Sequence, residues 1–121
     1  MSNLDLQIHK LLDDIYTSAS RIVERLHNET REGFLSAGGM DVQDIVARRL
    51  TIIGEASTAL LKKHPEFCEQ NKHIPLRQAR GMRNALVHDY DSIKWDLVWD
   101  TAQKELPKLI ESIAPLLGKN S

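Results

Sequence analysis

The stretch LDLQIHKLLDDIYTSASRIVERL, residues 4–26, decides the fold of this chain. Its apolar residues recur at intervals of three or four positions, which places them along one side of an α-helix. These apolar positions are Leu4, Ile8, Leu11, Leu12, Ile15, Ala19, Ile22, Val23 and Leu26. The stretch therefore predicts one long amphipathic helix that ends near His27 or Asn28.

Outward from this helix, a second amphipathic stretch runs from Asp41, which can cap the start of a helix, to His64 and Pro65, where it ends. Gly54 lies inside this stretch. A glycine within a helix costs roughly 1 kcal/mol against alanine. Either another helix approaches closely at Gly54 or the helix simply tolerates the glycine, and the sequence leaves both interpretations open.

The second half of the chain predicts two further helices. Residues 65–74 are predicted to form a loop, and Pro75 suits the first turn of the helix that follows. Ser92 can cap a long fourth helix whose apolar register continues beyond Pro107, so we expect a kink at that proline. The chain therefore predicts an all-α, antiparallel bundle of four to five helices, formed by residues 1–121 as a single domain.

Composition and charge narrow the classes of function. Aromatic residues make up only 5% of the chain, and its six glycines and four prolines are scattered, which favours helices over a β-sandwich or barrel. The formal net charge of -1 gives no global attraction to nucleic acid, so any anion-binding site must be a local cluster. No secretory leader or membrane-spanning stretch is visible, and the single Cys68 cannot form an internal disulfide. We therefore expect a cytoplasmic protein without a membrane partner.

The third predicted helix carries polar groups where an ordinary core helix would be apolar. At about 100° per residue, Met82, Ala85 and Leu86 share the core side, and Gly81 leaves room for something to approach. The opposite face carries Arg77, Arg80, Arg83, Asn84 and His88. This face is either a solvated basic surface or an anion-binding site. An amide and an imidazole four residues apart favour the second interpretation, because a solvated helix more often uses Lys and Glu there.

The spacing of Arg83 and His88 predicts a dimer. Five residues separate them, so on a straight helix they diverge by about 140° and about 7.5 Å along the axis. One copy of the helix therefore aims them poorly at one small ligand. A two-fold axis near Gly81 or Asn84 would bring both copies of each side chain into one cleft, because such an interface repeats every contact. We therefore expect a homodimer to be the functional unit.

The segment GMRNALVHDY, residues 81–90, resembles the HepT-like branch of the HEPN domains. It is preceded by LTIIGEAS, residues 50–57, and by Ile-Pro at 74–75, and it is followed by WDLVWDTAQKELPKL, residues 95–109. The signature of this branch is Arg, four residues, His, any residue and Tyr, which match Arg83, His88 and Tyr90 here. The four segments occur in the family's order, which makes the resemblance specific.

The resemblance implies a homodimeric helical bundle that acts as a metal-independent endoribonuclease, the toxin of a toxin-antitoxin pair. Its partner would be a minimal nucleotidyltransferase of the MntA type, which silences the toxin by transferring AMP to the motif tyrosine, here Tyr90. Arg83 and His88 would be catalytic, with Asn84 in support, and no cofactor is implied. Leu76 stands where family members often have Trp, which concerns the packing beneath the helix start rather than the site.

The chemistry of RNA cleavage fits these residue types. RNA supplies its own nucleophile, the 2′-hydroxyl group, so cleavage needs a base, an acid and positive charge around the phosphorus. Imidazole titrates close to neutral pH and can serve in either proton-transfer role. Our hypothesis is that His88 of one subunit acts as base and its mate as acid, while Arg83 binds the non-bridging oxygens. Arg77 and Arg80 either bind flanking phosphates or serve surface solubility.

A function of another class could use the same arginine face. The protein could be a non-catalytic subunit that binds nucleotide or substrate for a partner nucleotidyltransferase. Growth arrest on expression that is lost with His88→Ala favours the enzyme. Tight nucleotide binding without RNA cleavage favours the binding subunit.

One further motif resembles a metal site. HPEFC, residues 64–68, matches the first half of a zinc-deaminase signature, but the second half, P-C-x-x-C, is absent. No glycine-rich phosphate loop occurs either. No metal site and no cofactor are therefore predicted.

Overall fold

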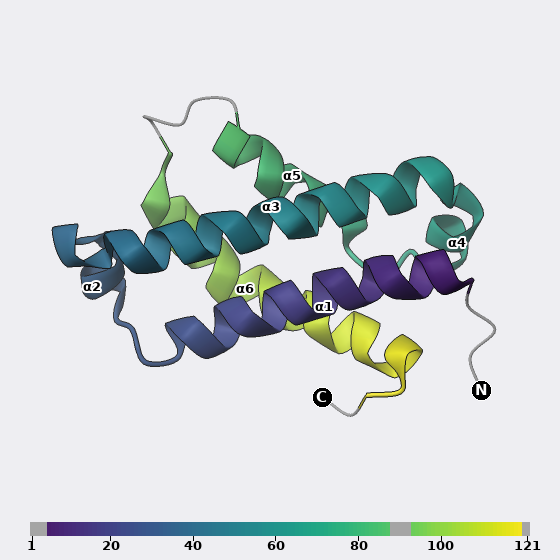
Figure 1. The fold of residues 1–121 in the computed structure, drawn as a ribbon, viewed down its shortest axis with the longest axis horizontal. Coiled ribbons are helices and arrows are strands. Elements are labelled where there is room, and N and C mark those ends of the chain that lie inside the picture. The colour runs from purple at the N-terminus through teal and green to yellow at the C-terminus, as the bar shows by residue number, and fades with distance from the viewer. Residues whose placement is uncertain (1–4, 88–92, 120–121) are drawn as a thin grey trace.

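The computed structural model describes residues 5–87 and 93–119, apart from the side chains at positions 84, 85 and 87 (Figure 1). Its helices are α1 (Leu6–Leu26), α2 (Arg31–Leu35), α3 (Met40–Lys63), α4 (Pro65–Gln70), α5 (Leu76–Val87) and α6 (Trp95–Ile113), with short 3-10 turns η1 (Ala37–Gly39) and η3 (Ala114–Leu117). These residues contain no strand, so the all-α prediction is confirmed. None of these helices combines the length and the apolar character that crossing a membrane requires.

The predicted helix over residues 4–26 is α1. The Asp5 carboxylate caps its start by accepting a hydrogen bond of 2.7 Å from the backbone N–H of Gln7, and His27 caps its end. Its buried residues are Ile8, Leu12, Ile15, Ser18, Ala19, Ile22 and Leu26. The apolar stripe read from the sequence therefore faces the core, as predicted.

The long helices form an antiparallel bundle around one hydrophobic core (Figure 1). Helix α3 runs beside α1 in the opposite direction and packs against α5 on its other side, while α6 packs against α1. Helices α1, α3, α5 and α6 all contribute buried residues to the core. Because α5 is held mainly by α3, the placement of its side chains depends on the surface that α3 presents.

Two predictions about helix boundaries were wrong. Residues 65–70 form helix α4 rather than a loop, because Pro65 suits a first helical turn and Phe67 is buried in the core. Asp41 does not cap α3, which follows directly from η1 with Gly39 at its N-cap. Asp41 lies in the first turn instead, where a negative charge favours the helix dipole. Ser92, the predicted cap of the last helix, lies outside the described residues.

Helix α2 is short and is anchored by one aromatic side chain. The Thr30 hydroxyl caps its start by accepting a hydrogen bond of 3.0 Å from the N–H of Gly33. Phe34 is 0% exposed, with its ring centroid 6.0 Å from that of Trp95 and 5.3 Å from that of Trp99. The two tryptophans at the start of α6 are half-buried and pack against α2 through Phe34.

Helix α6 continues without interruption through Pro107. The residues on both sides of the proline keep the apolar register, and Leu106 and Leu109 are both buried. Pro107 itself is exposed, which leaves its ring on the solvent side of the helix. The helix therefore does not stop and restart at this proline, and the kink expected there stays a prediction.

The contact at Gly54 decides between the two interpretations left open by the sequence. A Cβ atom added at Gly54 would overlap Arg83 Cβ and lie 3.1 Å from Arg83 Cγ and 3.2 Å from Arg83 Cα. Carbon atoms in favourable contact lie about 3.5–4.0 Å apart. Gly54 therefore permits a close approach of α5 to α3 at Arg83, and the close-contact interpretation is confirmed.

Candidate functional site

Helix α5 separates an apolar side from a basic side. Leu76, Ala79 and Leu86 are buried against the core, and the half-buried Met82 packs beside them. Positions 76–87 include no Asp or Glu and three arginines. The core side therefore agrees with the prediction at Met82 and Leu86, while the side chain of Ala85 is not described.

The three arginines of α5 differ in how far they extend from the bundle. Arg77 is exposed, whereas Arg80 and Arg83 are half-buried. Within residues 5–87 and 93–119, five ion pairs occur, and none of them includes an arginine of α5. These arginines therefore form no ion pair with a described carboxylate, although Glu69 lines the same pocket as Arg77. A helix with three arginines and no acidic residue suits binding of a polyanion.

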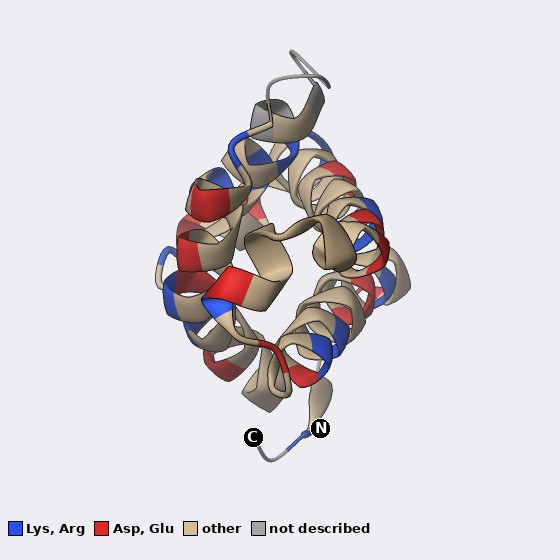
Figure 2. Ribbon diagram, turned by 90° about the vertical axis from the view of Figure 1, so that its left-hand side faces the viewer, with Lys and Arg blue, Asp and Glu red and all other residues tan. Residues whose placement is uncertain are grey.

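Figure 2 places this charge in the molecule. Lys and Arg segments of ribbon lie at the top, next to the thin grey trace there, and both acidic and basic segments lie lower on the two flanks. Helix α5 leads into residues 88–92, which are drawn as that trace. A chain with a formal net charge of -1 thus carries a local basic region at the place where the motif begins.

Arg83 packs directly against helix α3. Its Cβ lies directly against the α3 backbone at Gly54, and its Nε is buried without a hydrogen-bond partner among the described groups. A buried donor without a partner is unfavourable, so an ordinary surface arginine would not adopt this position. Packing of α5 on α3 therefore fixes the position of Arg83 Cβ, from which the rest of the side chain extends.

The structure brings together only part of the predicted site. Arg77, Arg80 and Arg83 lie on α5, but Arg83 packs against α3 rather than on the face opposite the core, where the helical spacing had placed it. His88 and Tyr90 lie outside the described residues, and nothing is described of the Asn84 side chain. The pairing of Arg83 with His88 therefore remains a prediction.

A groove beside α5 was not predicted from the sequence. It has a volume of about 370 Å³ and is lined by Leu50, Gln78, Gly81, Met82, Ile93, Lys94, Leu97, Val98 and Thr101. Leu97 is 56% exposed, and a Cβ atom added at Gly81 would meet no atom within 4 Å. The signal in the sequence is that Leu97 lies off the stripe formed by Trp95, Val98 and Trp99. Leu97 is therefore an exposed apolar residue at the edge of this groove.

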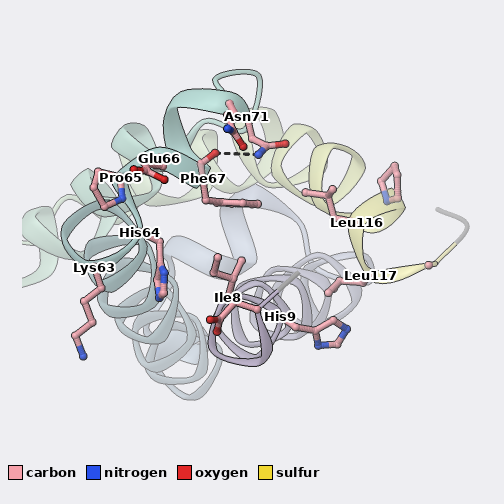
Figure 3. Close-up of a pocket in the computed structure, with 14 residues that line it drawn as sticks. Ile8, His9, Lys63, His64, Pro65, Glu66, Phe67, Asn71, Leu116 and Leu117 are labelled. Atoms are coloured by element: carbon pink, nitrogen blue, oxygen red, sulfur yellow. Dashed lines mark hydrogen bonds between the residues drawn. The ribbon is translucent and has the colours of Figure 1, made fainter. Parts of the chain in front are cut away.

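A larger pocket lies at the other end of the bundle, between the start of α1, the end of α3, α4 and η3 (Figure 3). Its volume is about 1130 Å³, and Ile8, Phe67, Leu116 and Leu117 provide its apolar lining. His64 Nε2 lies 2.7 Å from Gln7 Oε1, a hydrogen bond that ties α3 to α1. This pocket is remote from the C-terminal end of α5 (Figure 1).

The zinc-like segment is split between two surfaces. His64 and Glu66 line the large pocket, whereas Cys68 lines a different one beside Arg77. Burial raises the pKa of the Cys68 thiol, against a smaller opposing effect of the Arg77 charge, and the Cys68 Sγ donates a 3.5 Å hydrogen bond to the Leu60 carbonyl. Among the described residues, no three His, Cys, Asp or Glu side chains are grouped to hold a metal ion. These residues therefore form no shared site.

These features define a class: an all-α bundle with a basic helix packed on a glycine of its neighbour, leading into an Arg-x4-His-x-Tyr motif. The family described as "Ribonuclease HepT-like" matches residues 15–116. The chain belongs to this family, so the resemblance seen in the sequence is confirmed.

Relatives with known names agree with this membership. A protein of Methanocaldococcus jannaschii named "Gamma-glutamylcyclotransferase and putative RNase" is 34% identical over 93% of this chain, which spans 48% of that relative's length. A "Putative RNase" of Caldanaerobacter subterraneus is 31% identical over 89% of this chain and 92% of its own. A "Probable ribonuclease HepT" of Thermococcus cleftensis is 32% identical over 81% of this chain and 84% of its own. No solved structure matches the chain.

Proposed function

We propose that this protein is a metal-independent endoribonuclease, the toxin of a HepT/MntA-type toxin-antitoxin system. The observation that carries the proposal is the set of three arginines on α5, a helix that leads directly into the Arg-x4-His-x-Tyr motif in a chain of the HepT-like ribonuclease family. Phosphodiesters are the ligands that such a set of arginines suits best, since guanidinium groups bind phosphate oxygens in a bidentate manner. The names of the relatives support RNA as the phosphodiester concerned.

In the proposed reaction, His88 of one subunit takes the proton of the RNA 2′-hydroxyl, and the oxygen attacks the adjacent phosphorus. The bond from phosphorus to the 5′-oxygen breaks, and His88 of the other subunit gives that oxygen a proton. Arg83 stabilises the negative charge of the phosphorane, with Asn84 orienting His88. The products are a 2′,3′-cyclic phosphate and a 5′-hydroxyl end. Arg77 and Arg80 bind flanking phosphates.

The test of the proposal is cleavage of RNA by the purified protein in the presence of a metal chelator. We expect fragments that end in a 2′,3′-cyclic phosphate, identified by mass spectrometry of the digestion products. RNA in which the 2′-hydroxyl is replaced by hydrogen is the matched control and should remain intact. Nucleotide binding without any RNA cleavage would instead support the binding-subunit function.

The proposed dimer uses the groove beside α5. Its exposed Leu97 and open Gly81 lie next to the arginine helix, so a second copy seated there brings the two α5 helices close together. The groove adjoins α5 through Gln78, Gly81 and Met82. A two-fold interface there would bring an arginine and a histidine from both copies into one cleft, which the spacing on one helix does not provide.

Leu97→Asp is expected to weaken the proposed dimer by about 10²-fold or more, because two-fold symmetry buries the unpaired charge twice. Sedimentation equilibrium measures the dissociation constant, and RNA cleavage should fall with the fraction of dimer. Leu6→Asp is the matched control, since Leu6 is 89% exposed on α1, away from the groove. A Leu97→Asp protein that stays dimeric would place the interface elsewhere.

Tyr90 is proposed as the position that the partner nucleotidyltransferase modifies with AMP. A phosphate attached there would compete with RNA for the arginines of α5. After co-expression with the partner, mass spectrometry of peptides should show one AMP on Tyr90, with Tyr16→Phe as a control that keeps the modification and Tyr90→Phe as the variant that loses it. Full neutralisation of the toxin with Tyr90 unmodified would exclude this mechanism.

A further inference from the structure

The contact between Gly54 and Arg83 joins the middle of one long helix to the candidate catalytic arginine. An added Cβ at position 54 meets Cα, Cβ and Cγ of Arg83. Because one of these atoms belongs to the backbone, rotation of the arginine side chain cannot relieve the overlap. Only a displacement of α5 from α3 could accommodate any residue larger than glycine at this position.

The same contact restricts the arginine itself. Cβ and Cγ of Arg83 rest on bare α3 backbone, and its Nε is buried and has no hydrogen-bond partner among the described groups. Because Nε has no such partner, no hydrogen bond of this atom holds the guanidinium group in place. Leaving a buried donor unpaired is also unfavourable. The position of the side chain is therefore imposed by the packing of the two helices. A phosphate approaching from outside cannot reach the buried Nε.

We propose that Gly54 is a positioning residue for Arg83: the bare backbone at Gly54 holds the arginine stem so that the guanidinium presents its two terminal nitrogens, Nη1 and Nη2, to a phosphate. The inference rests on the proposed function for its catalytic meaning. Ordering a long side chain costs conformational entropy, and here that cost is incurred when the protein folds rather than when RNA binds. The arginine is thus preorganised for the charge that develops in the reaction.

The kinetic test is Gly54→Ala. Displacement of the guanidinium should lower kcat for RNA cleavage by about 10²-fold, since misplacement by about 1 Å can have that effect. KM should change little, because Arg77 and Arg80 still bind the RNA. Gly38→Ala is the matched control: its added carbon would meet only Ser36 Oγ, at 3.6 Å, so both constants should stay at the wild-type level. A folded Gly54→Ala protein with wild-type kcat overturns the proposal.

A spectroscopic measurement tests the contact between Gly54 and Arg83 independently of activity. In the wild-type protein, the Nε–H proton of Arg83 should exchange with water much more slowly than that of the exposed Arg77 in nitrogen-edited NMR spectra. In Gly54→Ala this protection should be lost. Equal exchange rates for the two arginines in the wild-type protein would show that Arg83 is not held in this way.

A double variant covers the case in which Gly54→Ala does not fold. Arg83→Gly removes the Cβ and Cγ atoms that the new methyl group meets, so Gly54→Ala should destabilise the protein less in that background than alone. Additive losses in melting temperature would show that the contact is not made. If the wild-type protein cleaves no RNA, the proposed function fails, while the exchange and stability results still test the contact between Gly54 and Arg83. If Arg83→Ala is inactive and Gly54→Ala is fully active, only the positioning role fails.

Discussion

Arg83→Ala is expected to lower kcat for RNA cleavage by about 10²- to 10³-fold, the loss typical of removing one group that stabilises transition-state charge. The side chain enters the site from the α3–α5 contact, with its stem packed and its Nε buried, so no neighbouring arginine can occupy its place. The measurement is steady-state cleavage of a defined RNA. Thermal unfolding of the variant shows whether it is folded under the assay conditions.

Arg77→Ala is the matched comparison on the same helix. Arg77 is exposed, so its loss should appear in KM and should lower the slope of log affinity against log salt concentration by about 1. Arg83→Ala should act chiefly on kcat. If Arg83→Ala and His88→Ala both cleaved RNA as fast as the wild-type protein, the assignment of the active site would be wrong.

Phe34→Ala is expected to lower the free energy of unfolding by about 3–5 kcal/mol. Phe34 has no exposed surface, and its ring packs against both Trp95 and Trp99, so truncation leaves a cavity between α2 and α6. The loss is a large part of the stability of a typical domain, about 5–15 kcal/mol. Urea unfolding followed by circular dichroism measures it.

Leu35→Ala provides the control for this second prediction. Leu35 adjoins Phe34 on α2 but is 36% exposed, so its truncation should change stability by only about 0.5 kcal/mol. A loss below about 1 kcal/mol for Phe34→Ala would mean that α2 and the start of α6 close over the cavity.

The long helices were predictable because their apolar periodicity alone specifies them. Helices α2 and α4 were not, because segments this short are helical mainly through tertiary packing. Phe34 and Phe67 are buried in the core, and each fixes a helix that has too few turns to show a period. The start of α3 was misplaced for a related reason: the η1 turn enters the helix directly, so Asp41 is not needed as its cap.

That α5 carries three arginines could be predicted from the sequence, whereas the packing of Arg83 against α3 could not. The role of Gly54 could not, since a tolerated glycine and a required one look the same in the sequence. Only the contact between α5 and α3 distinguishes them, and the two residues that make this contact, Gly54 and Arg83, are 29 positions apart in the sequence. Leu97 was not predicted as part of a surface because it lies outside the buried apolar stripe of α6.

The aromatic cluster has a practical consequence. Both tryptophans of the chain lie at the start of α6, within a few residues of the 88–92 segment, and none lies elsewhere in the sequence. Tryptophan emission, excited selectively over that of tyrosine, is thus an optical signal that comes only from the start of α6. Titration with an uncleavable RNA can be followed through it without an attached dye.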